Sequence, residues 1–288
     1  MRRRFLANLV LAGAVAALAA LLLLVKPAPE TVPPTPLTTI APDNIRSIHV
    51  ERTAAGPMHF ERRGKDWVMI APVNAPAYPA RIEAVLGLLS EPSHAQLAAG
   101  SQDLARFKLD APAVRLLLDT HEFDFGDTEP LEDRRYVRVD GRIHLIADTL
   151  LFQLTQNPGF FIDPKLLPGA TPPKRIVYPQ FTLIEEGGQW RQEPAAGLKP
   201  DQLKEISLNW ETARGITVRT PIEDTGTGRV TIDTGTGAPV QFGIILKEGN
   251  VILGRADLNV QYHLDSYTAE QLLLKDKPTA ADSKGVQE

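Results

Sequence analysis

Residues 79–89, PARIEAVLGLL, and residues 200–210, PDQLKEISLNW, decide the fold. Each stretch begins with a proline, and apolar residues follow at offsets of three, six and ten positions: Ile82, Val85 and Leu89 in the first, and Leu203, Ile206 and Trp210 in the second. Proline suits the first helical position because the N–H that it lacks would have no partner there. The spacing of the apolar residues places their side chains on one face of the helix. The sequence therefore predicts two helices of one design.

Short runs around these helices alternate between apolar and polar residues, at residues 48–51, 58–61 and 123–125. Period-two alternation is typical of strands with one wet face. Further strands are predicted at 114–118, 136–139 and 143–146, and Asp140-Gly141 between the last two predicts a tight hairpin turn. Asp148 is predicted to cap a short helix that ends at Leu154.

The second half of the chain repeats these landmarks. Phe60, Gly64 and Trp67 correspond to Phe181, Gly188 and Trp190, residues 123–126 correspond to 240–243, and residues 143–154 correspond to 262–274. Chance similarity of two strand-rich modules is the alternative, but we favour true duplication. The predicted fold class is α+β, with two related units of antiparallel sheet plus helix at residues 43–168 and 169–276, after a single N-terminal transmembrane helix.

The N-terminus predicts a membrane anchor. Residues 5–25 carry no charge and are long enough to cross the ~30 Å hydrocarbon core as a helix. Three arginines in residues 1–4 and only Lys26 after the segment predict a cytoplasmic start and a periplasmic remainder. A cleaved signal peptide is the alternative, but residues 25–29 make a poor cleavage site. The predicted location is the inner membrane, crossed once.

Composition limits what the exported part can do. Residues 26–42 contain six prolines, which predicts an extended spacer or a plain tether, and residues 277–288 are predicted to be a disordered tail. Cysteine is absent, which excludes disulfides and thiolate chemistry. Without the three N-terminal arginines, 28 basic residues stand against 35 acidic ones, a formal charge of about −7. Because phosphate backbones require clustered basic residues, no nucleic-acid partner is expected.

Two motifs resemble catalytic signatures but are explained by turns. Asp224-Thr225-Gly226 and Asp233-Thr234-Gly235 resemble the aspartic protease motif, yet nine residues separate the aspartates and residues 229–232 form a strand between them. Asp, Thr and Gly also favour hairpin tips. Asp124-Phe125-Gly126 resembles the kinase magnesium motif without its accompanying loops, so we interpret it as a strand that ends in a turn.

A more specific candidate site is a cluster of histidine and glutamate side chains in the first hairpin. If Val50 pairs with Phe60, then His49 faces Glu61 and Glu51 faces His59 on the wet surface. Two His and two Glu suit Zn²⁺, but cross-strand charge pairs that stabilise an exposed sheet are the preferred interpretation. No catalytic, cofactor-binding or metal residue is therefore assigned, no cofactor is expected, and His94, His121, His144 and His263 are interpreted as surface or turn residues. Trp67 and Trp190 are interpreted as core anchors.

Residues 45–167 contain a set of structural motifs: Trp67, the helix at Pro79, and the segments 107–112 (Phe-Lys-Leu-Asp-Ala-Pro), 125–126 (Phe-Gly), 135–138 (Arg-Tyr-Val-Arg), 140–141 (Asp-Gly) and 160–164 (Phe-Phe-Ile-Asp-Pro). Through these motifs this part of the chain resembles a bacterial family of unknown function. Lys108 stands where the family pattern has glycine, and the second half matches only loosely. Members are typically membrane-anchored envelope proteins, often associated with gliding-motility-type ABC transporter components. The resemblance implies an accessory role at a membrane machine and supplies no catalytic residues.

These features together predict a membrane-anchored periplasmic accessory or scaffold protein. It would act through contacts with envelope proteins, transporter subunits among them, and not as an enzyme. Sheet edges and the join between the units are the expected contact surfaces. A glycan-directed envelope hydrolase with paired carboxylates and a small-ligand binder that uses the crevice between the units are the alternatives.

Overall fold

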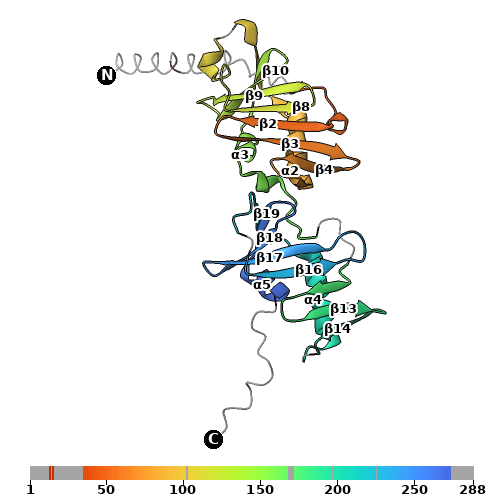
Figure 1. Cartoon of the computed structure of the whole chain (residues 1–288). Coiled ribbons are helices and arrows are strands. Elements are labelled where there is room, and N and C mark those ends of the chain that lie inside the picture. The colour runs from red at the N-terminus through yellow and green to blue at the C-terminus, as the bar shows by residue number, and fades with distance from the viewer. Residues whose placement is uncertain are drawn as a thin grey trace, which may run out of the picture. The chain divides into compact units, whose positions relative to one another are not determined.

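The computed structural model describes residues 13, 15, 35–101, 103–167, 172–195, 197–224 and 226–273. This part of the chain is mostly β-sheet with a few helices and contains three sheets (Figure 1). None of its helices is long and apolar enough to cross a membrane. The predicted anchor at 5–25, apart from Gly13 and Val15, and the predicted tail at 277–288 lie outside the described residues. The predicted domain boundaries remain predictions.

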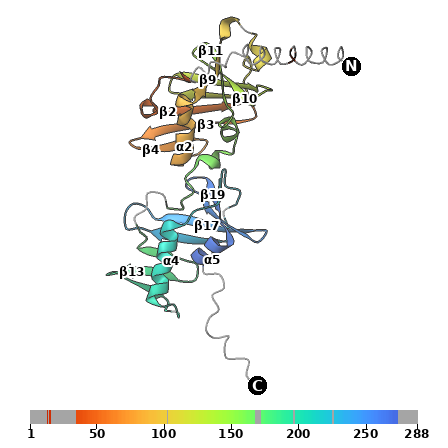
Figure 2. The ribbon, with the colours of Figure 1, turned by 180° about the vertical axis from the view of Figure 1, so that it is seen from behind.

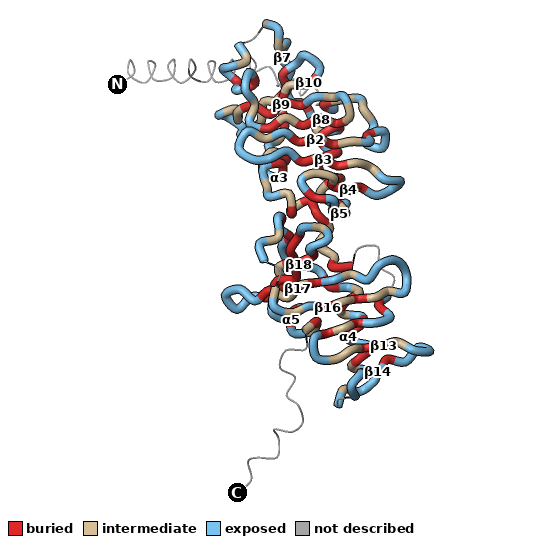
Figure 3. The backbone as a smooth tube through the Cα atoms, viewed as in Figure 1, coloured by how far each residue is buried: buried red, intermediate tan, exposed pale blue. Residues whose placement is uncertain are grey.

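The first large sheet has nine strands, which pair antiparallel throughout. In spatial order they are β5 (Ala75–Pro76), β4 (Asp66–Ala71), β3 (Ala55–Arg63), β2 (Ser47–Arg52), β8 (Val114–Leu118), β9 (His121–Thr128), β10 (Arg134–Val139), β11 (Arg142–Ala147) and β7 (Ala95–Ala98). Buried and half-buried residues alternate along β8, because successive side chains point to opposite faces, whereas residues 123–126 of β9 are all buried. The tube in Figure 3 shows the buried positions in red along the strands.

Helix α2 (Pro79–Gly87) lies across one face of this sheet, as Figure 2 shows. Pro79 occupies the start of the helix, and Ile82, Val85 and Leu86 are buried. A 3-10 turn, η2 (Leu88–Ser90), continues it and buries Leu89, so the predicted helix is confirmed with a tighter last turn.

The second large sheet has eight antiparallel strands in the corresponding order. They are β14 (Gln189–Glu193), β13 (Thr182–Glu186), β12 (Arg175–Val177), β16 (Gly228–Asp233), β17 (Val240–Lys247), β18 (Asn250–Arg255), β19 (Val260–His263) and β15 (Thr217–Arg219). Helix α4 (Pro200–Thr212) follows β14 as α2 follows β4 and β5, and helix α5 (Ser266–Leu273) follows β19. Both sheets thus share one order of strands and helices, and among the described residues only β5 has no counterpart.

A buried hydrogen-bonded chain ties the helices of the second half to its sheet. The indole N–H of Trp210 on α4 donates to the Tyr178 hydroxyl at 2.7 Å, and that hydroxyl donates to the carbonyl oxygen of Leu272 on α5 at 2.8 Å. Trp210 and Leu272 are 0 % exposed and Tyr178 is 5 % exposed. Burial raises the pKa of Tyr178 strongly, so the hydroxyl stays protonated and able to donate.

The remaining elements are short. They are β1 (Thr35–Pro36) and β6 (Pro92–Ser93), which form the two-stranded third sheet, η1 (Pro42–Asn44), η3 (Ala99–Ser101), η4 (Leu104–Phe107), α3 (Leu151–Leu154) and η5 (Pro158–Phe161). Helix α3 is preceded by Leu150 and not by a capping Asp148, so that prediction is wrong. Instead, the Asp148 carboxylate accepts a hydrogen bond from the Arg135 Nε at 2.9 Å and forms an ion pair with this arginine.

The segment that follows α3 contacts both halves of the chain. Ala77, next to β5, forms a β-bridge with Ile162, and the Asn157 amide donates to the carbonyl oxygen of Thr220 at 3.1 Å. Gly159 is required here, because a Cβ at this position would lie 2.3 Å from the carbonyl oxygen of Val218. Any larger residue would force this segment away from β15.

Candidate functional site

The first hairpin does not assemble the predicted His and Glu cluster. Val50 pairs with Met58 and Ile48 pairs with Phe60, so the predicted pairing of Val50 with Phe60 is wrong by two residues. An irregularity after Val50 sets this register, and a shift of two leaves every apolar side chain on the core face. Periodicity alone therefore could not distinguish the two pairings.

The observed register separates the four side chains. His49 lies opposite His59, with 5.4 Å between the ring centroids, and Ser47 lies opposite Glu61. Glu51 turns to the neighbouring strand, where its carboxylate lies 3.9 Å from the Arg115 guanidinium. Among the described residues, no group of three or more His, Asp or Glu could hold a metal ion. The hairpin thus presents a pair of imidazoles and an ion pair.

Asp124-Phe125-Gly126, interpreted from the sequence as a strand that ends in a turn, lies inside β9, which continues to Thr128. Its aspartate is a buried carboxylate, a feature that sequence reasoning missed, on the same face of the sheet as Glu51. Asp124 on β9 has a side chain only 1 % exposed, and its two oxygens accept hydrogen bonds from the Arg115 Nε at 2.8 Å and the Arg138 Nε at 2.9 Å. The hydrogen bond to Asp124 raises the pKa of Arg115. Both partners are on adjacent strands, so this cluster joins β8, β9 and β10 and has a structural role.

The side chains of a serine and a histidine that are far apart in the sequence also lie within hydrogen-bond distance. The Ser93 Oγ lies 2.9 Å from Nδ1 of His144, and the two residues are 5 % and 4 % exposed. His144 was interpreted as a surface or turn residue, and its burial corrects that interpretation. Burial lowers its pKa, so the imidazole is neutral. This pair fixes β6 against β11. Neither residue lines either of the two larger cavities, so the pair is not placed to contact a substrate there.

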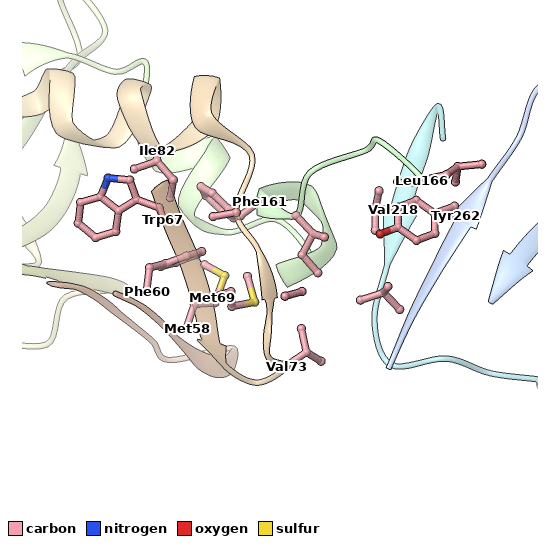
Figure 4. Close-up of a cluster of buried hydrophobic side chains, with 14 of the residues drawn as sticks. Met58, Phe60, Trp67, Met69, Val73, Ile82, Phe161, Leu166, Val218 and Tyr262 are labelled. Carbon is pink, nitrogen blue, oxygen red and sulfur yellow. The ribbon is translucent and has the colours of Figure 1, made fainter. Parts of the chain in front are cut away.

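The first large cavity is a groove of about 670 Å³ between α2 and strand β4. Residues at positions 79, 82, 83, 86 and 87 of α2 line one wall, which is the spacing of a single helix face. Trp67 and Val68 of β4 and Ala77 line the other wall. Trp67 is 7 % exposed and packs beside Ile82, as Figure 4 shows, so its predicted role as a core anchor is confirmed. Trp190 is buried in the second half.

Arg62 borders the groove above Trp67. Its guanidinium carbon lies 5.4 Å from the centre of the Trp67 ring, within cation–π range, and Nη1 donates to the carbonyl oxygen of Asp43 at 2.7 Å. Its buried Nε has no hydrogen-bond partner among the described residues. Arg63 and Lys65 add positive charge to the rim, while four carboxylates balance it: Asp43, Asp66, Glu83 and Asp163. The groove therefore combines apolar walls with charges of both signs.

The fold and this groove define a β-rich α+β protein with a groove of about 670 Å³ beside helix α2. A family model described as Domain of unknown function (DUF4340) matches residues 67–220, which is more than half of the chain, and the chain belongs to this family. No curated protein and no solved structure matches it. The matched region begins at the groove residue Trp67 and ends at Thr220, just after β15. The predicted resemblance to a family of unknown function is thereby confirmed.

Proposed function

We propose that this protein is an accessory or scaffold protein that binds a segment of a partner protein and does not act as an enzyme. The observation that carries the proposal is the groove between α2 and β4. Its volume of about 670 Å³ is in the range of ligand-binding clefts, and its walls are apolar. A rim with charges of both signs fits a protein segment in which apolar side chains alternate with acidic and basic ones.

The geometry of Arg62 supports a partner with an acidic side chain at this point. Its buried Nε lacks an acceptor, which costs about 1–3 kcal/mol, and its Nη2 lies 3.7 Å from the Asp43 carboxylate. A turn of the guanidinium toward a partner carboxylate in the groove would give Nε an acceptor. The same guanidinium covers Trp67, so the partner's apolar side chains would pack against Leu86 and Ile82 of α2.

The setting belongs to the proposal as well. Residues 5–25 would anchor the chain in the inner membrane, the remainder would face the periplasm, and the partner would be an envelope protein such as a subunit of an ABC-type transporter. The shared strand order of the two sheets supports their origin from one duplicated unit. A reporter fused after Glu288 should be active only outside the cytosol; activity confined to the cytosol would contradict this setting.

Site-specific photo-crosslinking in cells tests the binding role. A photoreactive residue at Glu83, on the exposed rim of the groove, should yield one reproducible adduct, identified by mass spectrometry as an envelope protein. The matched control is Leu208, which is 49 % exposed on α4, away from the groove, and should yield no such adduct. Equal labelling at the two positions, or no adduct at Glu83, would refute partner binding in the groove.

A further inference from the structure

A second cavity of about 690 Å³ lies where residues 156–164 meet the first turn of α2 and residues 215–219. Among the described residues, two arginines line it, Arg81 and Arg219, and no carboxylate does. This distinguishes it from the groove, where four carboxylates accompany three basic side chains. The cavity is therefore locally cationic within a chain whose formal net charge is −4.

Arg81 is held in place without using its hydrogen-bond donors. Its guanidinium carbon lies 3.9 Å from the centre of the Phe160 ring, so the planar group stacks on the aromatic face. Stacking leaves the N–H groups, which lie in the guanidinium plane, directed outward. Within the described part of the chain, no hydrogen bond or ion pair joins this guanidinium to another residue. The donors are thus oriented in advance and available.

The position of Arg81 in the helix is also unfavourable unless an anion is nearby. It lies in the first turn of α2, where the helix dipole is positive, and this turn contains no acidic residue. The corresponding helix α4 has Asp201 in its first turn, as the dipole favours. The stability of α2 therefore does not account for a cation at this position.

Arg219 supplies the second cation from a separate element. It is on β15, where its backbone pairs with Gln261, and its side chain is exposed. In the described residues its guanidinium has no hydrogen bond or ion pair. Ile216, which is 69 % exposed, lines the same cavity, so an apolar surface lies beside the two arginines.

We infer that this cavity binds a ligand with a phosphate group attached to an apolar or aromatic body. One arginine fork is enough for a carboxylate, whereas a phosphate monoester carries about −1.5 to −2 charges and three acceptor oxygens, which suits two arginines and a helix N-terminus together. The cavity is larger than a phosphate group alone requires, and Phe160 and Ile216 would contact the attached body. This site is separate from the groove of the proposed function.

Isothermal titration with phenyl phosphate tests the site, because this probe combines a phosphate with an aromatic ring. The full-length chain should bind it at 150 mM salt, and Arg81→Gln and Arg219→Gln should each weaken binding at least tenfold. Arg229→Gln is the matched control, because Arg229 is an exposed arginine on β16 outside the cavity. Arg81→Lys, which keeps the charge but loses the planar fork, should fall between the wild type and Arg81→Gln.

Vesicles distinguish a soluble ligand from a lipid headgroup. Co-sedimentation with phosphatidic acid vesicles, but not with phosphatidylcholine vesicles, would assign the phosphate to a lipid if Arg81→Gln and Arg219→Gln abolish it. Binding of phenyl phosphate alone would assign a soluble ligand. The inference is overturned if neither probe binds, or if both glutamine variants, with thermal unfolding like the wild type, bind as the wild type does.

Discussion

Replacing Tyr178 with Phe should destabilise the second half of the chain without altering its packing volume. The substitution removes one hydroxyl, which accepts from the Trp210 indole at 2.7 Å and donates to the Leu272 carbonyl at 2.8 Å. Both partners are fully buried, so water cannot replace the hydroxyl. A buried polar group without a partner costs about 1–3 kcal/mol. Two such groups predict a loss of about 2–6 kcal/mol in the free energy of unfolding.

The loss is measured by urea unfolding of the purified full-length chain, followed by circular dichroism because Trp210 itself would perturb a fluorescence signal. A loss of this size corresponds to a fall of about 4–24 °C in the thermal unfolding midpoint for a chain of this length. Tyr267→Phe is the control, because Tyr267 is 72 % exposed, and its unfolding should match the wild type. If Tyr178→Phe unfolds within about 0.5 kcal/mol of the wild type, the buried chain does not stabilise the fold.

Two further changes test the first half of the chain. The lowered pKa of His144 means that the unfolded state binds more protons below about pH 6.5. Stability should therefore fall as the pH drops through that value, by up to about 1.4 kcal/mol per pH unit. His144→Gln should reduce this slope, and the part due to His263, whose pKa burial also lowers, should remain. Gly126→Ala should cost about 1–3 kcal/mol in urea unfolding, because its Cβ would lie 2.3 Å from the carbonyl oxygen of Phe107. Gly56→Ala, where a Cβ meets nothing within 4 Å, should be nearly neutral, and equal losses would refute the argument.

Local signals in the sequence predicted local structure well. The apolar spacing after Pro79 gave the extent of α2, because burial on one helix face follows from periodicity. Asp140 and Gly141 join β10 to β11 with φ of 49° and 71°, the left-handed region that this dipeptide tolerates. Lys108 also has a positive φ, 53°, a conformation that favours glycine, the residue that the resemblance led us to expect at this position.

Features set by distant contacts were not predictable in this way. Strand β7 pairs with β11 at the edge of the sheet, and its four residues are all exposed. Ala95–Ala98 therefore lack the alternation of buried and exposed residues by which a strand is recognised. Asp124 stands in an alternating strand, and only the arginines on two neighbouring strands make its burial possible. A carboxylate between two apolar residues of a strand, with arginines at matching positions nearby, is the signal that could have found it.

The candidate site likewise combines local features that the sequence indicated with distant contacts that it did not. The apolar face of α2 was readable from spacing, whereas the groove depends on where β4 lies beside that helix. The pairing of Arg62 with Trp67 across β3 and β4 could have been inferred from the hairpin that joins these strands. The cavity with Arg81 and Arg219 brings together residues far apart in the chain, and no local pattern indicates it.

Blocking the groove by substitution tests the central claim most directly. Gly87 lines the groove at the end of α2, and a Cβ there meets nothing within 4 Å, so Gly87→Phe would fill the groove while the fold is retained. Gly56→Phe places the same side chain in open space outside the groove. With the photoreactive residue at Glu83, the partner adduct should disappear in Gly87→Phe and persist in Gly56→Phe. An undiminished adduct in Gly87→Phe would show that the partner does not bind in this groove.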